Sequence, residues 1–172
     1  MEIQLRSAEP RDAEAMASLY VSAARQAWSQ IFGVANLASL APPVDALRRR
    51  IGASGSDEHV IVAELDGEVR GYAIVRLSAD DDASGTTGEL DAIYTDPSVW
   101  GRGIGRALLA SAAQSLAERG FAEATLWTAE ANERPRLVYA AAGWEPDGTA
   151  RDRTWRGVRF RELRYRVALP FV

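Results

Sequence analysis

Apolar and polar residues alternate near the start of the chain and then change period. Residues Ile3 to Arg6 alternate strictly, which is typical of a half-buried strand. From Ala13 to about Gln26, apolar residues instead recur every three or four positions, behind a proline at Pro10. This spacing predicts an amphipathic helix that begins near Pro10.

The next third of the chain predicts a short helix followed by a β-hairpin. The helix spans Val44 to Ile51, and a loop follows from Gly52 to Glu58. Two apolar runs, Val60 to Leu65 and Val69 to Leu77, are separated only by Asp66-Gly67. Asp-Gly is a strong two-residue hairpin signal, because both of its residues tolerate a positive φ.

Strands and helices alternate in the following segment. An acidic loop from Ala79 to Gly88 leads into these elements, which indicate a β-α-β unit and a mixed α/β fold. The predicted elements are a strand over Leu90–Thr95, a helix over Gly103–Arg119, a strand over Ala122–Thr128 and a helix over Glu133–Ala142. No linker or repeat interrupts the chain, so residues 1–172 are expected to form one domain.

The tail from Trp144 to Val167 reads as two strands that turn near Arg156-Gly157. In the second strand, Val158 and Phe160 have one parity, whereas the apolar residues from Leu163 to Val167 have the other. A β-bulge near Arg161-Glu162 is the simplest way to bring both sets to one face.

Composition excludes several classes of function. Hydrophobic residues make up 47% and charged residues 26% of the chain, which is typical of a soluble globular domain. There is no cysteine and one histidine, His59, so thiolate or clustered-histidine metal sites are excluded and no metal is expected. A net charge of −4 argues against nucleic-acid binding. No run reaches the ~20 apolar residues of a membrane span, and no signal peptide is recognisable, so we expect a cytoplasmic location and no membrane partner.

Three glycines at alternate positions, Gly101, Gly103 and Gly105, lie between a strand and a helix. A helix N-terminus offers unpaired N–H groups to an anion, and glycines let the backbone approach it closely. Arg102 and Arg106 add cationic donors. The loop lacks the Gly-Lys-Ser/Thr of a nucleoside-triphosphate loop and the spacing of a dinucleotide fingerprint. A plain flexible turn remains the alternative.

The segment Leu90 to Leu109 around this loop closely resembles the acetyl-coenzyme A-binding motif of the GNAT superfamily of N-acetyltransferases. A second stretch, Leu126 to Arg134 followed by Val138 to Trp144, resembles a later motif of that superfamily. The chain departs from the pattern at Trp100, where the family usually has glutamine or arginine. The resemblance implies a twisted, mostly antiparallel sheet of about seven strands with a central parallel pair and about four flanking helices.

The resemblance also implies the residues that bind acetyl-coenzyme A as co-substrate. Backbone groups of the strand end would pair with the pantetheine amides, and the glycine loop would hold the pyrophosphate. Asn132 resembles the asparagine that contacts the cofactor in this family, although it could equally cap the following helix. The expected cofactor-binding residues are Ile93, Tyr94, Thr95, Gly101, Arg102, Gly103, Ile104, Gly105, Arg106 and Asn132.

The same resemblance implies that Tyr139 donates a proton to the leaving thiolate. The alternative interpretation is that Tyr139 is an aromatic residue of the hydrophobic core. The base is less defined. Glu89 is our first choice, with Asp91 on the same strand and Glu130 as other options, and a solvated carboxylate is the alternative for each.

The acceptor is expected to be a small-molecule amine or a peptide or protein amine. Trp28 and Phe32 are the predicted substrate-binding residues, and Trp127 and Trp155 are further candidates. Core packing explains these aromatics equally well. A homodimer is an open option for the assembly. The competing functions are a non-catalytic acyl-coenzyme A sensor or interaction module and, less favoured, a dinucleotide-binding protein.

Overall fold

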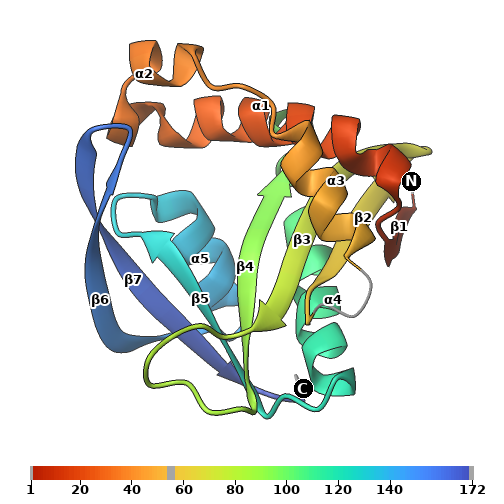
Figure 1. Cartoon of the computed structure of the whole chain (residues 1–172), viewed down its shortest axis with the longest axis vertical. Helices are drawn as coiled ribbons and strands as arrows, with labels where there is room; N and C mark the ends of the chain where they lie inside the picture. The colour runs from red at the N-terminus through yellow and green to blue at the C-terminus, as the bar shows by residue number, and fades with distance from the viewer. Residues whose placement is uncertain (1, 54–56, 171–172) are drawn as a thin grey trace.

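The computed structural model describes residues 2–53 and 57–170, which form one seven-stranded sheet with helices on both faces (Figure 1). The strand order is β1-β2-β3-β4-β5-β7-β6. The strands are β1 (Ile3–Ser7), β2 (His59–Leu65), β3 (Glu68–Leu77), β4 (Thr87–Thr95), β5 (Glu123–Ala129), β6 (Glu145–Trp155) and β7 (Val158–Ala168). The α-helices are α1 (Ala13–Phe32), α2 (Val34–Ala38), α3 (Val44–Gly52), α4 (Ile104–Glu118) and α5 (Glu133–Ala141).

Only β4 and β5 pair in parallel, and all other neighbouring strands of the sheet are antiparallel. The connection between β4 and β5 is α4, as a β-α-β unit requires. The predicted sheet with a central parallel pair is therefore confirmed. The described residues contain five α-helices rather than about four, because α1 continues to Phe32 and the short α2 follows it.

The sheet separates two hydrophobic cores. Leu108, Leu109 and Leu116 of α4 pack on one face against β2, β3, β4 and β5. Met16 and Leu19 of α1 pack on the other face against β2 and β3. Because both faces are covered, both parities of a central strand carry buried residues.

The predicted two-residue turn at Asp66-Gly67 and the predicted turn near Arg156-Gly157 are both present. Asp66 and Gly67 have φ values of 55° and 79°, and Arg156 and Gly157 have 49° and 79°. Positive φ at both central residues matches the right-handed twist of the flanking strands. The predicted loop from Gly52 to Glu58 includes residues 54–56, which lie outside the described residues.

The predicted β-bulge near Arg161-Glu162 is wrong. Residues 162–168 of β7 pair with β5 without a break, and the irregularity in the neighbouring ladder lies between Pro146 and Ala150 of β6. The two parities of β7 serve different cores. Phe160 contacts Phe32 of α1, whereas Leu163 and Tyr165 pack with the α4 core. No bulge is needed, because apolar residues on opposite faces are both covered.

A buried arginine joins the loop before β4 to the last two strands. Arg164 is 3% exposed, and its guanidinium contacts Asp80, Asp82 and Asp147 at 3.1, 2.6 and 2.6 Å. It also donates to Thr149 Oγ1 at 3.0 Å. A buried cation requires such a set of acceptors, because desolvation is costly without them. Alternation with the apolar residues Leu163 and Tyr165 predicts that Arg164 lies on a solvated strand face, and its burial shows that this prediction is wrong.

The single histidine, His59, is held between two serine hydroxyls. Its Nε2 lies 2.9 Å from Ser7 Oγ and its Nδ1 lies 2.7 Å from Ser115 Oγ. Burial lowers its pKa and favours the neutral ring. Across residues 2–53 and 57–170, no helix is long and apolar enough to cross a membrane.

Candidate active site

The site begins where β4 and β5 separate. The two strands pair over three positions only, Thr87 with Glu123, Gly88 with Ala124 and Glu89 with Thr125. Beyond these positions, β4 continues to Thr95 and β5 to Ala129 without pairing with each other, while each keeps its other neighbour, β3 or β7. A cavity of about 1060 Å³ occupies the split, and residues of α1, β4, β5, α4, α5, β6 and β7 line it.

A register shift in β4 sets which side chains face each side of this split. The pairing with β3 slips between Ile74 and Val75, so that Asp91 is an extra residue in β4. After this bulge, Ile93 packs with the α4 core and Tyr94 packs with the α1 core. The cavity therefore has one side built around α4 and α5 and another built around α1.

The predicted glycine loop lies on the α4 side. Gly101 and Gly103 have φ values of 84° and 88°, which a side chain would disfavour. Gly103 is the N-cap of α4, so the N–H groups of the first turn have no partner within the helix. Gly101, Gly103, Ile104, Gly105 and Arg106 all line the cavity, whereas Arg102 is not among the lining residues.

Trp100 forms a wall beside the loop. Its indole N–H donates to the carbonyl of Thr95 at 3.1 Å. The guanidinium of Arg134, from the first turn of α5, stacks on the Trp100 ring at 4.4 Å from its centroid. This cation–π contact places a positive charge next to the glycine loop. Sequence reasoning noted Trp100 but missed Arg134, because only the fold brings α5 beside the loop.

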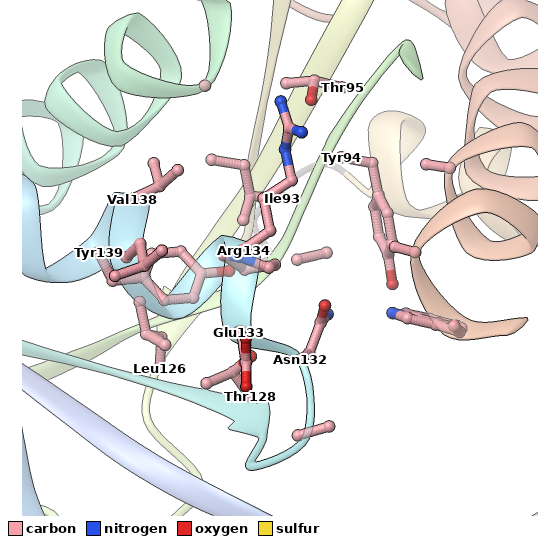
Figure 2. Close-up of a pocket in the computed structure, with 18 of the residues that line it drawn as sticks. Ile93, Tyr94, Thr95, Leu126, Thr128, Asn132, Glu133, Arg134, Val138 and Tyr139 are labelled. Carbon is pink, nitrogen blue, oxygen red and sulfur yellow. The ribbon is translucent and has the colours of Figure 1, made fainter. Parts of the chain in front are cut away.

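Tyr139 and Asn132 project from α5 toward β4. Figure 2 shows both residues facing Ile93, Tyr94 and Thr95 across the cavity. The Tyr139 hydroxyl has no hydrogen-bond partner among the described residues, and burial raises the pKa of this phenol, so it stays protonated. Asn132 occupies the N-cap position of α5 but makes no side-chain capping bond. Its amide is therefore directed to the cavity rather than to the helix.

The three candidate bases lie in different places. Glu89 is 7% exposed, accepts from Arg76 Nε at 3.1 Å and is not among the cavity-lining residues. Burial raises its pKa. Asp91 lines the cavity, 2.8 Å from Arg76 and 2.6 Å from Arg50. Glu130 is exposed and does not line the cavity.

Sequence reasoning missed a further carboxylate, Glu133, which lines the cavity at the first turn of α5. Its position next to Asn132 was the only available signal. The predicted substrate-binding residues Trp28 and Phe32 both line the α1 side of the cavity, as do Trp155 and Phe160. Trp127 also lines the cavity, but its indole N–H is bound to Asp80 at 3.0 Å.

Known proteins resemble this chain in sequence and in fold. The family model described as "Acetyltransferase (GNAT) family" matches residues 15–144. An uncharacterized N-acetyltransferase of Bacillus subtilis, YuaI, is 30% identical over 163 residues, which are 94% of this chain and 90% of that protein. A mycothiol acetyltransferase of Beutenbergia cavernae is 33% identical over 104 residues, which cover 60% of this chain and 34% of that protein. The chain thus spans about a third of the length of the curated mycothiol acetyltransferases that it matches.

The fold comparison agrees with the sequence comparison. The PaiA N-acetyltransferase of Thermoplasma acidophilum, solved in complex with coenzyme A, superposes with a TM-score of 0.79 at 19% identity. The match covers 98% of this chain and 99% of that structure. At this identity the superposition shows the fold, and the family follows from the sequence match. The chain belongs to the acetyltransferase (GNAT) family.

Proposed function

We propose that this protein transfers an acetyl group from acetyl-coenzyme A to a primary amine. The observation that carries the proposal is the cavity between β4 and β5, whose two walls offer different chemical groups. The α4 side offers unpaired backbone N–H groups and a phenol. The α1 side offers aromatic rings and Asp91, and Glu89 lies buried two residues before Asp91 in the same strand. A thioester held on one side can then be attacked by an amine from the other.

The α4 side suits acetyl-coenzyme A. The loop from Gly101 to Arg106 would receive the pyrophosphate on the N-terminus of α4, and Arg134 would add a cation. Past Glu89, the β4 edge that faces β5 has no strand partner, so its amides are available to the pantetheine arm. Asn132 supplies an amide from the opposite wall.

The chemistry requires that nitrogen lose two protons and that sulfur gain one. The acceptor ammonium loses its first proton to the base, and the free amine attacks the thioester carbon. The second nitrogen proton leaves as the carbon–sulfur bond breaks and the sulfur is protonated, which gives an amide, a thiol and one proton released to water. We assign proton donation to the sulfur to Tyr139. We assign proton removal to Glu89 acting through water, because the carboxylate of Asp91 is already engaged in ion pairs with both Arg50 and Arg76.

Replacement of Gly103 by alanine tests the pyrophosphate loop. Because φ is 88° at this position, alanine should strain the turn by about 1–2 kcal/mol and re-aim the N–H groups. We expect the Kd of coenzyme A to rise about tenfold in titration calorimetry, the effect of losing about one hydrogen bond to a charged group. Gly120→Ala is the control, since Gly120 follows the same helix with φ 90° and a Cβ there would meet no atom within 4 Å. Equal losses of affinity in both variants would contradict the loop assignment.

Glu89→Gln tests the base. The raised pKa of Glu89 means that it ionises only above the usual range of a glutamate, so kcat/KM should increase with pH through that pKa. In the variant, this rise of kcat/KM on the acidic side of the pH profile (the acidic limb) should disappear. The kcat should fall about 100-fold. Asp91→Asn is the matched control, because Asp91 contacts the same Arg76, and it should keep the limb. A limb that persists in Glu89→Gln and disappears in Asp91→Asn would move the role to Asp91.

The proposed function itself is tested by thiol release from acetyl-coenzyme A with a panel of amines and by mass spectrometry of the products. Acetylated amine formed in equal amount to free coenzyme A is the expected result. Tight binding of acetyl-coenzyme A with no acetylation of any amine would instead indicate a sensor. Stabilisation of the fold by NAD and not by coenzyme A would reject both.

A further inference from the structure

The α1 side of the cavity is walled by aromatic rings that meet edge to face. This aromatic wall consists of Tyr20, Trp28, Phe32, Tyr94, Trp155 and Phe160, all of which line the cavity. Phe32 is central, with ring centroids 4.7 Å from Trp155 and 5.0 Å from Phe160. Apart from Phe32, these rings are only half-buried, so they leave apolar surface open to the cavity. Concave apolar surface of this kind binds an apolar body.

The turn between β6 and β7 bridges to α2 beside this wall. Arg156 Nε donates to Asn36 Oδ1 at 3.1 Å, and Asn36 Nδ2 donates to the Arg156 carbonyl at 3.1 Å. The Arg156 guanidinium also bonds to Ser39. Figure 1 shows the tip of this hairpin next to α1 and α2. The bridge ties the hairpin that carries Trp155 and Phe160 to the segment that follows α1.

The charges of the cavity match a single ammonium group. Three carboxylates line it within the described ranges, Asp91, Glu133 and Glu162. Asp91 is paired with two arginines, and Glu162 accepts from Arg151 Nε at 2.6 Å. Among the described residues, Glu133 alone of the three has no arginine partner, and the exposed Arg153, which also lines the cavity, adds a positive charge. A polyamine would face repulsion there and would lack carboxylates for its further charges.

We propose that the acceptor is a small molecule with one primary amine on a flat apolar body, of the arylalkylamine type. The ring would rest against the aromatic wall, and the amine would reach the split between β4 and β5. This inference rests on the proposed acetyl transfer and narrows its substrate class.

The first test compares acceptors. Initial rates of thiol release and product masses are measured for 2-phenylethylamine and tryptamine, with n-butylamine, spermidine and a peptide with a free N-terminus as comparisons. We expect kcat/KM for the arylalkylamines to exceed that for n-butylamine by about 100-fold, the scale on which a hydrophobic pocket discriminates a ring from a short chain.

The second test removes one ring. Trp155→Ala should reduce the preference for tryptamine over n-butylamine about tenfold. The KM for acetyl-coenzyme A should not change, and this unchanged KM is the control for an intact fold. Trp155→Phe keeps a ring at the position and should retain most of the preference. If Trp155→Ala keeps the same preference, the aromatic wall does not contribute to acceptor recognition.

The outcomes separate this inference from the proposed function. Faster acetylation of spermidine or of the peptide than of the arylalkylamines would overturn the inference and leave acetyl transfer intact. Acetylation of none of these classes, with acetyl-coenzyme A bound, would overturn both. Selective acetylation of the arylalkylamines supports both.

Discussion

Tyr139→Phe should lower kcat about 100-fold while leaving the KM for acetyl-coenzyme A unchanged. The substitution removes only the hydroxyl, which is the group assigned to protonate the leaving sulfur, and general acid catalysis contributes on this scale. Because this hydroxyl has no partner among the described residues, its loss leaves no buried polar group unsatisfied. Steady-state kinetics with a fast acceptor measure the effect.

Tyr165→Phe is the matched control. Its ring lies 6.0 Å from that of Tyr139, and its hydroxyl accepts from Arg136 Nε at 3.2 Å rather than lining the cavity. It should keep its kcat and lose about 1 kcal/mol of stability with its hydrogen bond. Since burial raises the pKa of Tyr139, wild-type activity should not decline through loss of this proton below about pH 10. Similar kcat values for Tyr139→Phe and wild type would exclude the phenol as the acid.

Arg164→Met should lower the free energy of unfolding by about 3 kcal/mol, because it removes the buried cation that Asp80 and Asp147 share and leaves Asp147 with the longer contact to Arg166 at 3.3 Å. For a chain of this size the melting temperature should fall by about 10 °C. Urea denaturation and thermal melts measure both quantities. Arg159→Met is the control: it lies in the same strand as Arg164 and breaks an exposed pair with Asp152 of β6, and it should leave the free energy of unfolding nearly unchanged.

The pH dependence of stability gives a second measurement on the same variant. Arg164 lowers the pKa of Asp82 to about 2. Burial raises the pKa of Asp147, but hydrogen bonds from the Thr149 backbone N–H and from Arg164 outweigh it and lower that pKa overall. A carboxylate whose folded pKa is depressed stabilises the fold above its unfolded pKa, near 3.9, and loses this contribution as pH falls toward 2. Wild type should therefore lose stability over this acid range, and Arg164→Met should show a shallower dependence. Parallel acid profiles would mean that Arg164 does not hold these carboxylates.

The elements that sequence alone predicted are those with local signals. Asp66-Gly67 and Arg156-Gly157 specify their own turns, and the alternation of strand and helix around Gly103 specifies a parallel pair. Six predicted strand or helix segments before Gly120 match the structure within a few residues. For these elements the local spacing of apolar residues is a sufficient signal, because the buried face of a strand or helix determines that spacing.

Features that depend on distant partners were not predictable. Arg164 meets carboxylates 82 and 84 positions away, so its place in a strand suggested only an exposed face. Phe160 and Leu163 both looked like members of one core face, because the sequence does not show that α1 and α4 cover opposite faces of β7. The bulge at Asp91 and the stacking of Arg134 on Trp100 likewise arise only after distant elements pack together.

The separation of β4 from β5 gives this sheet two edges in its middle. Sheet edges normally lie at the outside, where charged residues, bulges or covering loops keep them from pairing with other chains. Here the edges lie inward, next to the bulge at Asp91, and α5 and the aromatic wall flank the gap. Any extended molecule with amide groups could dock between them as an added strand. Occupancy of the gap should then tie the β1–β4 half of the sheet to the β5–β7 half, and slower amide hydrogen exchange in both strands would report it.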